Sequence, residues 1–482
     1  MRIVSLASLL VPLLIAPVAF AAEEPPKKAP TIPQALEIAR MWIDAQRAYD
    51  EVPGMSYAVV HGQKVVWSGG SGVADRQTKQ PATADTIYSI CSVSKLFTSL
   101  GVMQLRDAGK LALDDPLSKH LSWFRMRPHE EGREPTIRSV LTHSSGLPRE
   151  SDYPYWTDPF DFPTREKVIE RLQAQEPLYP SERFLQYSNL GITLAGEIIS
   201  AVSGVPYDEY VRRNILAPVG LTSTFTEIPL AERGKRLAAG YSAKRRDGSR
   251  AALPPFQVRG IAPAAGFAST ANDLARFAAW NFRVLQGEQG VIDPRTLREM
   301  QRAHWVEPDL DSFWGLGYSV WKDDGKVFVG HGGACPGFRT SLTLDTARRI
   351  GVVVLANANG IQPARYAKAL YDIIAPALES GAQPDAGTAA SLAPYVGSYD
   401  SFPWSGETIV AAWGDELLFI GLPTMDPMKE PAKFRRTGEH RFRRVRKDGS
   451  LGETVVFDIG PDGRAIRYWQ HSNPYPRMAN GN

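Results

Sequence analysis

A serine and a lysine stand three residues apart at the head of an apolar stretch, and this pair most constrains the fold of the chain. Ser92 and Lys95 open a segment whose apolar residues, over 96–105, recur at helical spacing. The spacing predicts a helix that begins near Ser92 and ends before Gly109. Positions i and i+3 of a helix share one face, so the amine lies beside the hydroxyl. The helix N-terminus adds a partial positive charge there.

This arrangement suits a serine that acts as a nucleophile. A hydroxyl is a poor nucleophile until a base takes its proton, and a partly buried amine can take it. The four-residue pattern alone is a weak signal, because a chain of this length contains it about once by chance. Two later motifs strengthen it. Tyr187-Ser188-Asn189 precedes an apolar run, and His331-Gly332-Gly333 ends one strand-like segment just before another.

In this order the three motifs resemble those of the penicillin-recognising serine hydrolases. The resemblance is greatest to the group that holds class C β-lactamases, D-alanyl-D-alanine carboxypeptidases, D-aminopeptidases and related esterases. It covers roughly residues 35 to 378. Three further stretches support it, at residues 141–148, 265–270 and 314–318.

The resemblance implies that Ser92 attacks a carbonyl and forms an acyl-enzyme, with Lys95 and Tyr187 as its activating groups. A nearby ammonium favours a phenolate. We therefore expect the pKa of Tyr187 to lie well below its reference value of about 10, which would let this residue act as general base. The sequence leaves open which of the two groups takes the proton first. A tyrosine that only packs in the core is the alternative for Tyr187.

The resemblance also assigns the substrate contacts. It places Asn189 against Lys95 and against a substrate amide oxygen. The oxyanion hole is expected at the backbone N–H groups of Ser92 and Ala334. Glycines such as Gly333 would let a substrate lie against this strand as an added strand does.

His331 is the main departure from the family pattern, because most β-lactamases have lysine at this position. An imidazole offers a weak, pH-dependent charge, which argues against efficient β-lactamase or strict carboxypeptidase action unless another cation such as Arg339 substitutes. His143 is interpreted as a structural residue at a helix end, next to a turn. Five aromatic residues either line the substrate pocket or pack a long loop onto the body of the domain: Tyr153, Tyr155, Trp156, Phe160 and Phe162.

Cys91 and Cys335 are the two cysteines of the chain. Cys91 immediately precedes Ser92, and Cys335 lies two residues beyond the third motif. The resemblance places that motif's strand alongside the start of the Ser92 helix, and some class A β-lactamases that hydrolyse carbapenems have a disulfide at matching positions. We therefore expect a Cys91–Cys335 disulfide in an oxidising compartment. Two buried free thiols are the alternative.

The first 21 residues have the layout of a secretory signal peptide. Residues 3–18 form a short apolar core, and Ala19-Phe20-Ala21 supplies a cleavage site. A membrane anchor is the alternative, but the core is short for a spanning helix and contains two prolines. No later segment is apolar for long enough to span a bilayer. We expect a periplasmic or secreted protein with no transmembrane anchor after cleavage.

The remaining sequence predicts an α+β fold followed by a small all-β domain. Strand-like segments lie near both ends of a mostly helical region, which suits an antiparallel sheet flanked by helices, together with an all-helical part. Short strands separated by turn residues then predict a barrel-like C-terminal domain. The expected order is a signal peptide (1–21), a flexible leader (22–32), the hydrolase domain (33–378), a linker (379–391) and the β domain (392–482).

These features together predict an exported serine hydrolase that cleaves amides or esters through a Ser92 acyl-enzyme. A peptidase acting on peptides that contain D-amino acids ranks first, ahead of a carboxylesterase and a β-lactamase. The alternative of another class is a non-catalytic envelope protein that binds peptidoglycan. No cofactor or metal is expected, and the partner would be a small-molecule or peptide substrate, peptidoglycan-derived or a β-lactam. A net charge of +3 gives no reason to expect nucleic-acid binding, and the oligomeric state is left open.

Overall fold

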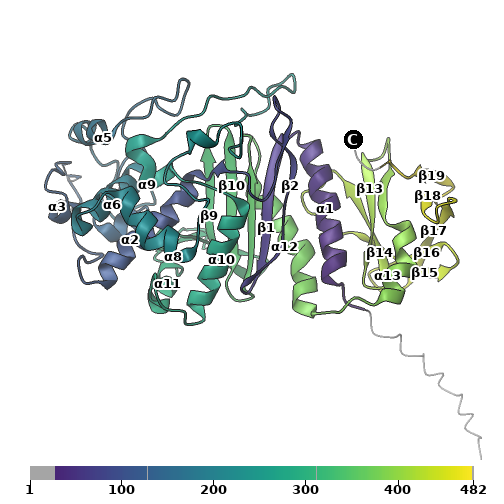
Figure 1. The fold of residues 1–482 in the computed structure, drawn as a ribbon. Helices are drawn as coiled ribbons and strands as arrows, with labels where there is room; N and C mark the ends of the chain where they lie inside the picture. The colour runs from purple at the N-terminus through teal and green to yellow at the C-terminus, as the bar shows by residue number, and fades with distance from the viewer. Residues whose placement is uncertain (1–27, 128, 311, 480–482) are drawn as a thin grey trace, which may run out of the picture.

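A computed structural model describes residues 28–127, 129–310 and 312–479. The predicted signal peptide and most of the predicted leader lie outside the described residues. The described chain forms a mixed helix-and-sheet part and a C-terminal barrel, with two helices between them (Figure 1).

The first part is built on a nine-stranded antiparallel sheet. Its strand order is β3-β2-β1-β11-β10-β9-β8-β7-β6, so strands from both ends of this region meet at the β1–β11 pair. The strands are β1 (Gly54–His61), β2 (Lys64–Asp75), β3 (Gln80–Pro81), β6 (Trp305–Val306), β7 (Ser312–Trp314), β8 (Ser319–Asp323), β9 (Lys326–Cys335), β10 (Phe338–Asp345) and β11 (Ile350–Ala356). A separate short pair joins β4 (Tyr88–Ser89) to β5 (Ala268–Ser269).

Helices cover both faces of this sheet, as the apolar residues of its central strand require. Every residue of β11 is buried, and successive side chains enter different cores. Val353 and Leu355 join the larger core, which also contains α2 (Ser94–Asp107), α6 (Asn189–Ser203) and α10 (Ala271–Leu285). Val352 and Val354 join a second core with α1 (Ile32–Tyr49) and α12 (Pro363–Ser380).

The remaining helices are short and lie mainly in the helical region around α2 and α6 (Figure 1). They are α3 (Leu117–His120), α4 (Ile137–Leu141), α5 (Arg165–Leu172), α7 (Tyr207–Val211), α8 (Ala217–Val219), α9 (Ala262–Ala265), α11 (Pro294–Met300) and α13 (Ala386–Leu392). Single turns complete the set: η1 (Cys91–Val93), η2 (Arg212–Leu216), η3 (Leu230–Glu232), η4 (Arg259–Ile261) and η5 (Ala393–Tyr395). The predicted α+β class is therefore confirmed.

The C-terminal part is an eight-stranded antiparallel sheet that curls into a nearly closed barrel, as predicted. Consecutive strands pair in sequence order, and the last strand returns to the first through a bridge between Tyr399 and Arg477. The strands are β12 (Gly397–Asp400), β13 (Glu407–Trp413), β14 (Glu416–Leu422), β15 (Ala432–Gly438), β16 (Arg441–Val445), β17 (Leu451–Ile459), β18 (Ala465–Gln470) and β19 (Asn473–Pro476). The end of α12 and most of α13 occupy the stretch for which a linker was predicted.

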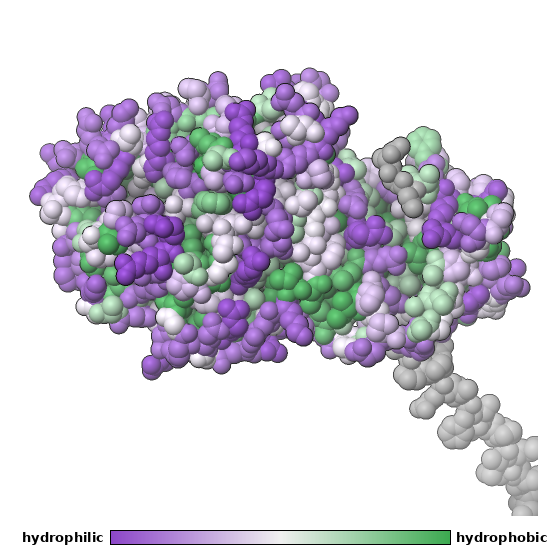
Figure 2. All heavy atoms as spheres, in the orientation of Figure 1, coloured by the Kyte–Doolittle hydropathy of each residue, from purple (hydrophilic) through white to green (hydrophobic). Residues whose placement is uncertain are grey.

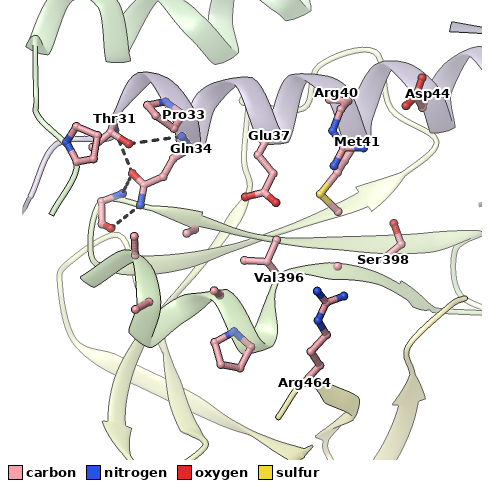
Figure 3. A pocket seen from close by; sticks show the side chains of 18 of the residues that line it. Thr31, Pro33, Gln34, Glu37, Arg40, Met41, Asp44, Val396, Ser398 and Arg464 are labelled. Atoms are coloured by element: carbon pink, nitrogen blue, oxygen red, sulfur yellow. Dashed lines mark hydrogen bonds between the residues drawn. The ribbon is translucent and has the colours of Figure 1, made fainter. Parts of the chain in front are cut away.

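Helix α1 joins the two parts. Its apolar side faces α12 and the sheet, while Gln34 exchanges two hydrogen bonds with the backbone of Gly414 in the barrel, at 2.9 and 3.0 Å. Between α1 and the barrel lies a cavity of about 1530 Å³. Figure 3 shows Glu37 and Met41 pointing from α1 toward Val396, and Arg464 entering from the barrel side.

The face of the molecule seen in Figure 2 is mainly hydrophilic over the first part, with apolar side chains gathered near the middle of the molecule. Among the described residues, no single helix is long and apolar enough to cross a membrane. One pair of consecutive helical segments, Asn189–Ser203 and Tyr207–Val219, is together long and apolar enough to cross a membrane. The two segments are bent by 81° relative to each other.

Candidate active site

The structure places Ser92 in a single turn that leads directly into the predicted helix. Ser92 lies in η1, and α2 continues from Ser94 to Asp107, so the helix ends before Gly109 as the spacing predicts. Cys91, just before the serine, has φ of 51°, a left-handed conformation that is uncommon for a residue with a side chain. Ser92 itself is half-buried. Its backbone N–H lies at the start of the helix, where N–H groups lack intrahelical acceptors.

Lys95 is fully buried, and its amine lies beside the serine as predicted. Its Nζ is 3.1 Å from Ser92 Oγ, 2.8 Å from Asn189 Oδ1 and 2.7 Å from the carbonyl oxygen of Ala264. The last two atoms are acceptors only, whereas the serine hydroxyl can donate. An ammonium can donate to all three atoms, whereas a neutral amine donates to Asn189 and Ala264 and can accept from the Ser92 hydroxyl. Burial favours the neutral form, because it holds the pKa of Lys95 well below its ordinary value.

Asn189 is the first residue of α6 and connects Lys95 to a carboxylate that the motifs do not include. Ser188 caps this helix by accepting a hydrogen bond from the N–H of Gly191 at 2.8 Å. The side-chain amide of Asn189 then accepts from Lys95 and donates to Glu150 Oε1 at 2.6 Å. Lys95, Asn189 and Glu150 therefore form one connected hydrogen-bond network beside Ser92.

Glu150 is held from its other side by the aromatic loop. The hydroxyl of Tyr155 donates to Glu150 Oε2 at 2.5 Å, and Tyr155 packs against Trp156 and Phe162. Tyr155 and Phe162 are almost fully buried, so for these two residues the structure supports loop packing rather than pocket lining. Arg149 lies close by, with its Nε 3.5 Å from Glu150 Oε1.

Tyr187 lies close to Lys95, with which it is predicted to activate Ser92. The amine of Lys95 is 4.9 Å from the centre of its ring, and Ser92 is close enough to its phenol to influence the pKa of Tyr187. Burial raises the pKa of Tyr187, and this outweighs the opposing effects of Ser92 and the charge of Arg149. The expected low pKa is therefore wrong. The environment favours a neutral phenol, because burial disfavours the charged phenolate.

Two histidines and a tryptophan surround the Tyr187 ring. His143 stacks on it with ring centres 4.2 Å apart, while Trp314 and His331 lie at 5.7 and 6.3 Å. Trp314 belongs to the stretch 314–318 that supported the family resemblance. The sequence alone did not show that His143 contacts a motif residue, because the two are 44 positions apart.

His331 is buried and electrically neutral. Its Nδ1 is 2.6 Å from the carbonyl oxygen of Gly332, so Nδ1 carries a proton and donates it. Burial, followed by the proximity of Lys95, lowers the pKa of His331 to about 3. The weak, pH-dependent charge expected near neutral pH is therefore absent at this residue. Arg339 on β10 pairs with Ala334 on the neighbouring strand β9. Because side chains alternate along a strand, both point to the face of the sheet opposite to the one that carries Cys335. Arg339 thus does not replace the missing lysine on the Ser92 side.

The third motif provides an open strand edge beside Ser92. Among the described residues, β8 pairs with β9 over Lys326 to Gly330, which leaves the following residues of β9 unpaired on that side. A side chain at Gly333 would collide with the carbonyl group of Ile90 and the hydroxyl of Thr340. Glycine is therefore required for the close approach of this strand to the start of the Ser92 turn. The next residue, Ala334, brings its backbone to that same end of the strand.

Cys91 and Cys335 form the predicted disulfide, with Cα atoms 5.8 Å apart. The bond ties the end of β9 directly to the residue before Ser92. No group of three His, Cys, Asp or Glu side chains in the described ranges could hold a metal ion.

Sequence reasoning missed Arg149, Glu150 and Trp314 as members of this site. Arg149 places its guanidinium 4.9 Å from the Tyr187 ring centre, and its side chain is 60% exposed. The available signal was position: two charged residues follow directly after the stretch 141–148, which supported the resemblance.

Comparisons with known proteins agree with this geometry. Residues 40–375 match the beta-lactamase family model. The chain is 29% identical to Beta-lactamase-like protein 2 of Dictyostelium discoideum, over 74% of this chain and 68% of that protein. It is 28% identical to Protein flp of Staphylococcus aureus strain N315, over 66% of this chain and 61% of that protein.

Two solved structures share the fold. The octameric penicillin-binding protein homologue from Pyrococcus abyssi superposes with a TM-score of 0.63 at 25% identity, covering 91% of this chain and 99% of that one. A D-stereospecific amidohydrolase from a Streptomyces species superposes with a TM-score of 0.59 at 24% identity, covering 70% of this chain and 98% of that one. The family model spans most of the chain and includes Ser92, Lys95, Tyr187 and His331, so the chain belongs to the beta-lactamase family of hydrolases.

Proposed function

We propose that the protein is an exported serine hydrolase that cleaves amide bonds in peptides containing D-amino acids, through an acyl-enzyme at Ser92. Family membership supports the hydrolase chemistry. The observation that carries the substrate proposal is Glu150, a carboxylate joined to Asn189 inside the site. The shared fold with a D-stereospecific amidohydrolase is compatible with this substrate class, and the sequence of residues 1–21 supports export.

The proposed reaction uses the protonation states that the site favours. Neutral Lys95 takes the proton of Ser92 while Ser92 Oγ bonds to the substrate carbonyl carbon. As the carbon–nitrogen bond breaks, the phenol of Tyr187 gives its proton to the leaving nitrogen, and the ammonium of Lys95 then restores that proton. Water hydrolyses the resulting ester and frees Ser92. Backbone N–H groups of Ser92 and Ala334 would hold the oxyanion.

Glu150 favours a substrate that carries an ammonium near the scissile amide. Its carboxylate accepts hydrogen bonds from Asn189 and Tyr155 and is 19% exposed. His331 is neutral, so the third motif adds no positive charge to offset it. A free amino terminus on the substrate would pair with this carboxylate, and such complementarity supplies specificity. We therefore place substrates with a free amino terminus first, and the D configuration is proposed from the family resemblance and not from Glu150.

Arg149 favours a second candidate function, the binding or hydrolysis of penicillins. Its exposed guanidinium above Tyr187 could bind a substrate carboxylate, because a guanidinium can donate two parallel hydrogen bonds to a carboxylate. The Arg149 side chain is 60% exposed against 19% for Glu150, so solvent and salt screen its charge more, and this is why the candidate ranks second.

The test compares matched substrates on the mature protein. D-Alanine p-nitroanilide should be hydrolysed faster than its L-enantiomer, and acetylation of its amino group should lower kcat/KM at least about tenfold because the ion pair with Glu150 is lost. Glu150→Gln should erase the difference between the free and acetylated substrates. Ser92→Ala is the inactive control.

Other outcomes would redirect the proposal. Equal rates on the free and acetylated forms would remove the role given to Glu150. Intact-protein mass spectrometry with benzylpenicillin tests the second candidate, since a stable adduct absent from Ser92→Ala would support a penicillin-binding protein. A complete lack of Ser92 labelling by a fluorophosphonate would favour a non-catalytic binding protein.

A further inference from the structure

His143 holds the backbone on both sides of Tyr187. The N–H of Gln186 donates to the carbonyl oxygen of His143 at 2.7 Å, and the N–H of Ser188 donates to His143 Nδ1 at 3.2 Å. Gln186 and Ser188 are the residues directly before and after the tyrosine. One histidine therefore holds the backbone at the residue before Tyr187 and at the peptide group that follows Tyr187.

The imidazole also supports the ring itself. It stacks on Tyr187 at 4.2 Å between ring centres, with the ring planes 30° apart. Trp314 in turn meets His143 edge to face, at 4.8 Å and 88°. His143 is fully buried between these rings, so it limits the tilt of the phenol that reaches Ser92.

The hydrogen bond from Ser188 also defines which nitrogen of His143 bears the proton. Nδ1 accepts, so it has a lone pair, and the neutral ring carries its proton on Nε2. Within the described residues, Nε2 is buried and has no hydrogen-bond partner. Burial is the largest cause that lowers the pKa of His143. Protonation at Nδ1 would set two donors against each other and break the contact with Ser188.

His143 also has a backbone conformation suited to this role. It follows the end of α4 with φ of 57°, a left-handed conformation in which histidine and asparagine occur more often than most other residues. This turn directs the carbonyl toward Gln186 and the ring toward Tyr187 at the same time.

We propose that His143 is a positioning residue that fixes the phenol of Tyr187 for proton transfer to the leaving group. This inference rests on the proton-donor role given to Tyr187 in the proposed function. It extends the expectation that His143 is only structural, because it assigns an effect on one chemical step.

Two aryl esters test the role independently of any peptide specificity. Acylation of Ser92 by phenyl acetate expels a basic leaving group that needs a proton, whereas p-nitrophenyl acetate expels a weakly basic one that does not. In His143→Asn, the amide oxygen can still accept from Ser188 and the left-handed backbone is tolerated, but the stacking ring is lost. His143→Phe keeps a ring and removes the acceptor.

His143→Asn should slow acylation by phenyl acetate about tenfold, a part of the roughly 10²–10⁴-fold that general acid–base catalysis contributes, and change p-nitrophenyl acetate little. His143→Phe should have the larger effect. In a Tyr187→Phe background the histidine substitutions should add nothing, because their effect passes through the phenol. Thermal melting checks that each variant is folded, and His143→Asn carries the test if His143→Phe does not fold.

Equal slowing of both esters, or an undiminished effect in the Tyr187→Phe background, would show a general structural role and overturn the inference. An unchanged phenyl acetate rate in His143→Asn would overturn it as well. Failure of D-peptide hydrolysis with normal ester behaviour would count against the proposed substrate alone. Absence of ester acylation in the unaltered protein would overturn both proposals.

Discussion

The protonation of Lys95 is set by its position in the site. The amine has two obligatory acceptors and one hydroxyl around it, and burial lowers its pKa. The acylation rate should therefore fall as pH drops through the lowered pKa of Lys95, because the ammonium cannot accept the proton of Ser92. Above that pKa the rate should level off. Stopped-flow acylation by p-nitrophenyl acetate between pH 5 and 10 would measure this limb.

His331 provides the control for that measurement. Its pKa of about 3 keeps the imidazole neutral over the whole range, so His331→Gln should leave the midpoint of the acidic limb in place even if the rate changes. A limb that disappears in His331→Gln would assign the titration to the imidazole and contradict the role of Lys95.

At the scale of elements, the disulfide and the left-handed backbone conformation of Cys91 both constrain the turn η1 that carries Ser92. Cys91 is bonded to β9 through Cys335 and has φ of 51°. The bond closes a sequence separation of 244 residues, for which chain entropy sets an upper bound of about 5 kcal/mol on its stabilisation. We predict that Cys91→Ala with Cys335→Ala lowers the free energy of unfolding by up to that amount and slows Ser92 labelling by a fluorophosphonate.

A glycine at position 91 separates the two contributions. A left-handed conformation costs a residue with a side chain about 1 kcal/mol, so Cys91→Gly with Cys335→Ala should be more stable than the double alanine variant by roughly that amount. Urea unfolding of the pair would measure it. Equal stability of the two variants would mean that the backbone relaxes once the bond is removed.

The same elements show which parts of the site can be predicted from sequence. Ser92 and Lys95 meet because helical periodicity alone places i and i+3 on one face, and the family resemblance supplied Tyr187, Asn189 and the disulfide pairing. Glu150 could not be found in this way. It meets Asn189 only because two segments 39 positions apart fold together, and no local periodicity encodes such a contact.

The ionisation states of Lys95 and Tyr187 likewise could not be predicted from the sequence. The expected phenolate at Tyr187 assumed that the nearby amine is charged. In the structure both groups are desolvated, which disfavours the charged form of each. Burial is a property of the whole fold, so motif spacing could identify the two groups but not their charges.

At the scale of the whole molecule, the barrel shares a core with the hydrolase part. Ile409 and Leu418 from the barrel lie in the same apolar cluster as Trp42 of α1 and Tyr366 of α12. Trp42 also donates its indole N–H to the carbonyl oxygen of Thr424 at 2.8 Å. A continuous core of this kind predicts that the two parts unfold together rather than as separate domains.

Leu418→Ala tests this coupling, because Leu418 is fully buried on the side of the barrel that faces α1. Removing a buried leucine costs about 2–5 kcal/mol. We expect calorimetry to show one transition at a lower temperature, with loss of Ser92 labelling following the same curve. Phe434→Ala is the matched control, since Phe434 lies in the separate core inside the barrel. If Leu418→Ala split the transition and left Ser92 reactive after the barrel had melted, α1 would belong energetically to the hydrolase part alone.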